Sequence, residues 1–279
     1  MKTPDSETSA KSIMRNHPVE LSPADRQKLT LNFFEPQPGL KKYAICATSD
    51  VARGKRILYN NKMKRFNIAP DEFLHVYNRG IAKNIIFFND RDRKRFLFLM
   101  MILQIPETMK NLNRMFKDFI LDPETYIKNF DSNLLKNRQI KLINFCLMPN
   151  HFHLLLQEAE EGGISKYMQR LQNAYTKYIN TKYERSGHLL QGAYKAVLIE
   201  NNEQLLYISS YIHKNPREIK ELKNKELKYF WSSYQDCVLV NRWGKFLQPD
   251  IITSQFSSKN SDTYKIFVET SPAKESKIF

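Results

Sequence analysis

The sequence predicts an α+β fold in which an antiparallel hairpin packs against an amphipathic helix. The hairpin is indicated by two runs rich in apolar, β-branched and aromatic residues, 140–147 and 151–156. Met148-Pro149-Asn150 separates them and favours a turn, because proline fixes φ and asparagine tolerates turn geometry. The helix is predicted over 164–183, where apolar residues recur at helical spacing and form one face.

The composition limits the class of protein. The 279 residues include 44 Lys and Arg against 29 Asp and Glu, a formal net charge of +15, and 42% are apolar. This is enough for one sizeable domain, and the positive excess favours a nucleic acid or another anionic partner. A merely soluble basic protein has the same composition.

Neither secretion nor membrane insertion is expected. Cys46, Cys146 and Cys237 lie far apart, which argues against a disulfide scaffold or a zinc knuckle and fits a reducing cytoplasm. The N-terminus has no apolar stretch suited to a signal peptide, and no run of about 18 apolar residues predicts a membrane span. We therefore expect a cytoplasmic protein.

Three segments are expected along the chain. Residues 1–70 form a basic, partly disordered N-terminal extension, in which 53–65 carries six positive and no negative charges. That run is either a nucleic-acid arm or a solvated loop. Residues 71–240 form the compact domain, and 241–279 form a polar, irregular C-terminal tail.

The elements of the compact domain follow in order. A strand over 74–80 ends at Gly80, a helix starts at Asp90 as N-cap and runs to Ile105, and 106–139 is a helical insertion before the hairpin. After helix 164–183, a strand is predicted over 193–199. The next helix begins at Asn202 or Glu203 and must end by Pro216. Residues 230–234 form an aromatic cap.

A pair of histidines opens the second arm of the hairpin. Residues two apart in a strand point to the same face, so His151 and His153 project together. Phe152 between them then points into the core on the other face. Two imidazoles held in this way form half of a metal site. Such a pair, taken alone, is more often a packing feature.

The helix before Pro216 carries a second set of polar residues. Tyr207, Tyr211 and Asn215 are spaced by four and line one strip. If that strip faces the histidines, two imidazoles and an amide oxygen can hold a divalent cation beside a phenol. A phenol with a pKa of about 10 is protonated at neutral pH and needs activation before it attacks phosphorus. A metal that neutralises a phosphate oxygen assists that attack.

Positive side chains provide candidate contacts to a nucleic-acid strand. Lys166, Arg170 and Lys177 lie on the outer face of helix 164–183, which contains no acidic residue, and Lys195 follows on the next strand. Such a stripe can track a phosphate backbone, although an ordinary solvated face fits equally well.

The ordered motifs resemble the HUH single-tyrosine transposases, most closely the REP-associated tyrosine transposases. The matching stretches, over about 73–236, are 75–80 (HVYNRG), 148–156 (MPNHFHLLL), 175–180 (YTKYIN), 186–192 (SGHLLQG), 211–216 (YIHKNP) and 231–234 (WSSY). The set is more specific than any of its pieces. Two stretches depart from the family: Ala193 stands where an arginine is usual, and Arg217-Glu218 follow Asn215-Pro216 where Ala-Gly is frequent.

The resemblance implies a ferredoxin-like fold, an antiparallel sheet of four or five strands with helices on one face. It implies that His151, His153 and Asn215 bind Mg²⁺ or Mn²⁺ and that Tyr211 is the nucleophile. Family members cleave and rejoin single-stranded DNA at hairpin or palindromic sites through a 5′-phosphotyrosine. They act as homodimers with shared active sites or as self-sufficient chains, and the sequence leaves this open.

Two other functions fit the same residues. The first is a non-catalytic nucleic-acid-binding protein on the same fold, which would bind hairpins without metal dependence or cleavage. The second is a metal-dependent nuclease that uses water, which would have no use for the strip of Tyr211 and Asn215.

Overall fold

The computed structural model describes residues 68–106, 111–256 and 262–273. The expected N-terminal extension, with the basic run 53–65, lies almost wholly outside these residues. Within them, four strands form one antiparallel sheet in the order β2-β3-β1-β4. The strands are β1 (Phe73–Arg79), β2 (Ile140–Met148), β3 (His151–Glu158) and β4 (Lys195–Ile199). With a helical crossover between β1 and β2 and another between β3 and β4, this is ferredoxin-like topology and confirms the predicted fold.

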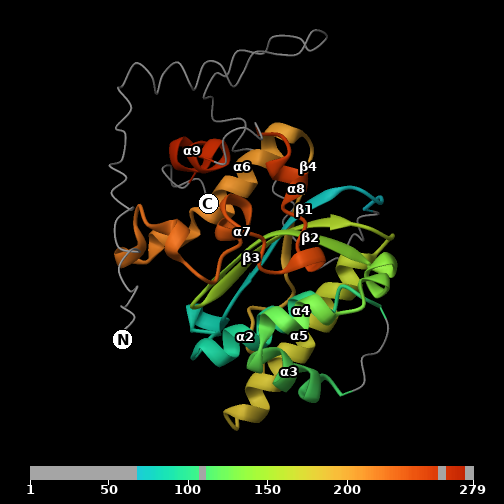
Figure 1. Ribbon diagram of the computed structural model, residues 1–279. Coiled ribbons are helices and arrows are strands. Elements are labelled where there is room, and N and C mark those ends of the chain that lie inside the picture. The colour runs from blue at the N-terminus through green and yellow to red at the C-terminus, as the bar shows by residue number, and fades with distance from the viewer. Residues whose placement is uncertain (1–67, 107–110, 257–261, 274–279) are drawn as a thin grey trace, which may run out of the picture. The chain divides into compact units, whose positions relative to one another are not determined.

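The helices divide into two layers, one on each face of the sheet (Figure 1). The first crossover contains α2 (Asp90–Ile102), α3 (Leu112–Leu121) and α4 (Pro123–Asn129), and the second is α5 (Gly163–Lys182). The other layer contains α6 (Asn202–His213), α7 (Tyr234–Val238), α8 (Asp250–Thr253) and α9 (Asp262–Thr270). No described helix is long and apolar enough to span a membrane.

The first layer packs on the face to which Phe152 points. The Phe152 ring lies 4.9 Å from the ring of Phe96 on α2, which lies 4.9 Å from Tyr175 on α5. All three side chains are fully buried. The predicted helices on one face are therefore confirmed, and α6 adds a helix on the opposite face, where it contacts β2, β3 and β4.

Local capping explains where the crossover helices begin. The Asn89 side chain accepts a hydrogen bond from the amide of Asp92, so Asn89, not Asp90 as predicted, is the N-cap of α2. At α5 the buried carboxylate of Glu158 accepts hydrogen bonds from the amides of Gly163 (2.8 Å) and Ile164 (2.9 Å). A negative group at the first turn also suits the helix dipole.

The described part of the chain after residue 240 is not an irregular tail. Trp243, Phe246 and Tyr264 are buried in the core, and α9 packs against α6. The fully buried ammonium of Lys214, just after α6, donates hydrogen bonds to the carbonyls of Glu269 and Ser271. The prediction of an irregular segment was wrong here because its apolar residues are widely spaced in a polar background.

Candidate active site

The site lies on the α6 face of the sheet, where β3 presents its two histidines. His151 and His153 alternate with core residues, as predicted, and their ring centroids are 5.1 Å apart. Both residues are buried, each with 6% of its surface exposed. The register of the hairpin keeps both rings on one face, because shifting a strand by one residue would turn them into the core.

Strand β1 adds three side chains to the same face. His75, Tyr77 and Arg79 are two residues apart, and Tyr77 and Arg79 lie directly opposite His153 and His151. His75 Nε2 is 2.9 Å from His153 Nδ1 within a buried hydrogen bond. None of these three residues was predicted to belong to the site. The signal was their two-residue period, the same pattern that identified the histidine pair.

The Nδ1 atom of His151 has a hydrogen-bond partner of its own. It lies 2.6 Å from Oδ1 of Asn150, and since an amide oxygen can only accept, the imidazole donates. The other ring nitrogen, Nε2, faces Oε2 of Glu218 at 4.0 Å. In both histidines Nδ1 is thus engaged, which fixes the ring orientation.

Helix α6 brings Tyr211 to the histidines. The Tyr211 ring centroid is 5.6 Å from that of His153 and 5.7 Å from that of His75, both edge-on. Burial raises the pKa of the Tyr211 phenol well above its usual range. Glu218 acts in the same direction, and Arg79 opposes it. The phenol therefore stays protonated at neutral pH unless a positive charge is added nearby.

Asn215 lies just past the end of α6 and is fully buried. Its Nδ2 donates to the carbonyl of Tyr211 at 2.9 Å and to that of Ile212 at 3.3 Å, so the side chain closes the last turn of the helix. These bonds fix the amide one turn beyond the tyrosine. Its predicted role as a metal ligand stays a prediction.

The donor set on this face suits a divalent cation chemically. With Nδ1 held by a neighbour, each imidazole would present Nε2 to a metal, the arrangement in which an outer partner orients a ligating histidine. Among the described residues, no three His, Cys, Asp or Glu side chains already converge on one point. A bound ion would therefore need an oxygen ligand of another kind, such as the Asn215 amide, or a side chain that moves.

The four predicted DNA-contacting cations do not share one surface. Lys195 is directly opposite Tyr77 across β1 and β4, so it is on the histidine face, and it is exposed. The other three belong to α5, on the opposite layer. There Lys166 pairs with Glu160 at 3.3 Å, and Arg170 donates to the carbonyl of Ile105.

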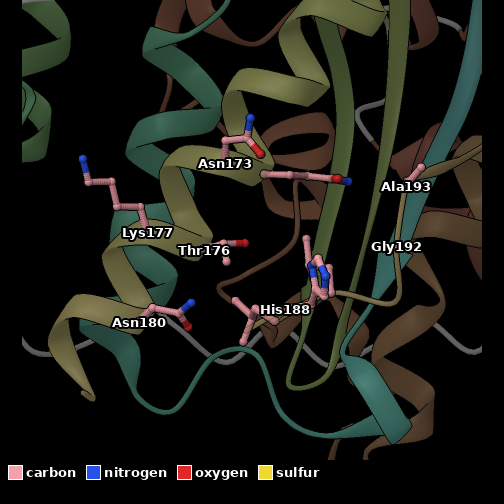
Figure 2. A pocket seen from close by; sticks show the side chains of 10 residues that line it. Asn173, Thr176, Lys177, Asn180, His188, Gly192 and Ala193 are labelled. Atoms are coloured by element: carbon pink, nitrogen blue, oxygen red, sulfur yellow. The ribbon is translucent and has the colours of Figure 1, made fainter. Parts of the chain in front are cut away.

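Lys177 borders a polar cleft of about 550 Å³ between α5 and the loop that precedes β4. Figure 2 shows Asn173, Thr176 and Asn180 along the helix and His188 on the loop opposite. The Lys177 side chain points away from that loop (Figure 2). The loop also contacts the end of β1, where the Gln191 amide donates to the Arg79 carbonyl at 2.8 Å. The cleft and the histidine site are thus connected by one short segment.

The comparison with protein-family models agrees with the resemblance seen in the sequence. Residues 108–215, which include the histidine pair, α5 and Tyr211, match the family model described as IS200-like transposase. A solved structure of a REP-associated tyrosine transposase bound to a REP hairpin aligns with a TM-score of 0.41 at 13% identity. The alignment covers 63% of this chain and 84% of that one. No curated protein matches the sequence.

Proposed function

We propose that this chain is a metal-dependent, single-tyrosine DNA transposase that cleaves and rejoins single-stranded DNA at hairpin or palindromic sites. The match of residues 108–215 to IS200-like transposases supports the transposase function. The observation that carries the mechanism is the position of Tyr211, whose ring lies 5.6 Å from that of His153.

In the proposed reaction the Tyr211 phenol gives up its proton and its oxygen attacks a backbone phosphorus. The new bond joins the phenol oxygen to phosphorus while the bond from phosphorus to O3′ breaks, and the leaving O3′ takes up a proton, so one fragment leaves with a free 3′-hydroxyl. The other fragment stays attached as a 5′-phosphotyrosine. The phosphoester is exchanged rather than hydrolysed, so a 3′-hydroxyl can later attack the same phosphorus and release the tyrosine.

The chain's own groups hold the reactants in place. His151, His153 and Asn215 would hold Mg²⁺ or Mn²⁺, which when bound supplies positive charge that stabilises a phosphate oxygen and favours the tyrosinate. His75 fixes the ring of His153 through its 2.9 Å hydrogen bond. Lys195 is our candidate for contact with the DNA strand on the histidine face, and Lys177 is the candidate beside the cleft. Lys166 and Arg170 are weaker candidates because Lys166 pairs with Glu160 and Arg170 bonds the carbonyl of Ile105.

A labelled hairpin oligonucleotide tests the proposal. With Mn²⁺, the full-length protein should form a denaturant-resistant adduct with the 3′-labelled strand and release a 5′-labelled fragment that ends in a hydroxyl. Tyr211→Phe should abolish the adduct. Tyr207→Phe, a half-buried tyrosine one turn earlier on α6, is the matched control and should retain it.

The other outcomes separate the rival functions. An adduct that survives Tyr211→Phe would remove the assignment and direct attention to Tyr207. Cleavage without an adduct would indicate a nuclease that uses water. Hairpin binding with neither metal dependence nor cleavage would indicate a DNA-binding protein without transposase activity.

A further inference from the structure

One carboxylate on the histidine face has no role in the mechanism above. Glu218 ends the single-turn helix η4 (Asn215–Glu218), which starts at Asn215 and contains Pro216. The turn is closed by the amide of Ile219, which donates to the Pro216 carbonyl at 2.9 Å. The neighbouring Arg217 forms an ion pair with the carboxylate of Glu226, which anchors the turn.

Glu218 is close to two groups of the site. Its Oε2 is 4.0 Å from His151 Nε2, and its charge raises the pKa of the Tyr211 phenol. The Glu218 side chain is 51% exposed, whereas the histidine it faces is 7% exposed. The carboxylate therefore lies at the open side of the site, between the imidazole and solvent.

The contact between Glu218 and His151 is not a hydrogen bond, since 4.0 Å is well beyond hydrogen-bond distance. Nδ1 of His151 carries the proton that it donates to Asn150, so in the neutral ring Nε2 presents a lone pair to the carboxylate. Two electron-rich atoms that face each other are stable when a cation lies between them. A divalent ion bound to both atoms would supply that charge.

The spacing and the chemistry favour the metal. Two atoms that each bind an ion at about 2.1 Å can be no more than about 4.2 Å apart, and the observed 4.0 Å is within this limit. Mg²⁺ and Mn²⁺ prefer carboxylate oxygens, whereas two imidazoles and an amide carry no compensating charge.

We propose that Glu218 is a carboxylate ligand of the divalent cation held by His151 and His153. This inference rests on the proposed metal site and adds a residue to it. Glu218 lies at the open side of the site, half exposed at the end of a single turn, and is placed to contact an ion bound there. It would also neutralise part of the ion's charge and bias the site toward hard cations.

Mn²⁺ binding to the full-length protein without DNA tests this role, measured by electron paramagnetic resonance of the free ion. Glu218→Gln should weaken the affinity by at least about 10-fold, the lower end of the cost of losing a metal site's outer partners. Glu221→Gln, an exposed acid in the next turn, is the matched control and should bind Mn²⁺ as the wild type does.

A Glu218→Gln protein with an Mn²⁺ affinity within about twofold of the wild type overturns the inference. Such a result would mean that the carboxylate only pairs with a protonated His151. If Glu218→Gln weakens Mn²⁺ binding but the wild-type protein forms no DNA adduct, the ligand assignment is supported and the proposed transposase chemistry is contradicted. The two failures are thus distinguishable.

Discussion

The hydroxyl of Tyr264 connects α9 to the helix that carries Tyr211. It lies 2.5 Å from Oγ of Ser209 and 2.8 Å from Nδ1 of His213, and both partners are fully buried on α6. Tyr264→Phe removes this oxygen and keeps the ring, so the substitution tests the hydrogen bonds alone. Ser209 keeps its bond from Asn144 and His213 keeps Ser233, but each loses one partner. At about 1–3 kcal/mol for each of these two buried groups that loses a partner, we expect a loss of about 2–6 kcal/mol.

Equilibrium unfolding in urea measures this loss. The midpoint should fall while the m-value stays constant, because the packing of the ring is unchanged. Tyr126→Phe is a suitable control, since Tyr126 is half buried and its hydroxyl has no hydrogen-bond partner within the described residues. The control should change stability by no more than about 0.5 kcal/mol. Equal losses in the two variants would refute the argument that α9 stabilises α6 through this hydroxyl.

Three further predictions concern pH, DNA and metal. Burial lowers the pKa of His213 to about 3, so as the pH falls this ring takes up a proton in the unfolded chain before it does so in the folded one. The free energy of unfolding should therefore decrease below about pH 6.5, by about 2 kcal/mol at pH 5. In urea unfolding, His213→Gln should lack this decrease, and a variant with the same pH profile as the wild type would contradict the prediction. Lys195→Ala should lower the slope of log K against log salt concentration for hairpin binding by about one, whereas Lys166→Ala, whose lysine is paired with Glu160, should leave that slope unchanged. A lower slope for Lys166→Ala alone would count against a DNA path over the histidine face. His75→Phe removes the hydrogen bond that orients the His153 ring, so it should weaken Mn²⁺ binding about 10–100-fold. An unchanged Mn²⁺ affinity would show that His75 does not orient His153 for metal binding.

The periodic parts of the fold could be predicted from the sequence. The two-residue period of His151 and His153 gave the correct face of β3, and the helical period of α5 gave its buried residues, including Tyr175. Both signals come from elements that bury one face against the same core. The spacing of Tyr207, Tyr211 and Asn215 predicted one strip and left open whether it faces the histidines; in the structure the Tyr211 ring lies 5.6 Å from that of His153.

The rest depends on contacts between segments far apart in the chain. Nothing local to β1 shows that His75 will meet His153, because that contact depends on which strands pair. Glu218 likewise faces His151 only because the turn after Pro216 returns the chain to the sheet. Arg170 fits a DNA stripe by sequence, but its guanidinium bonds the carbonyl of Ile105, an acceptor that no sequence pattern reveals.

The hydrogen bonds from Lys214 to the carbonyls of Glu269 and Ser271 determine how long a segment two subunits could exchange by domain swapping. An ammonium that stays buried without its acceptors is an unpaired charge out of water, which carries a large free-energy cost. A subunit that placed its Tyr211 in the active site of a neighbour would therefore have to exchange α6 and α9 together. Any hinge for such an exchange must lie before Asn202, in the residues that follow β4.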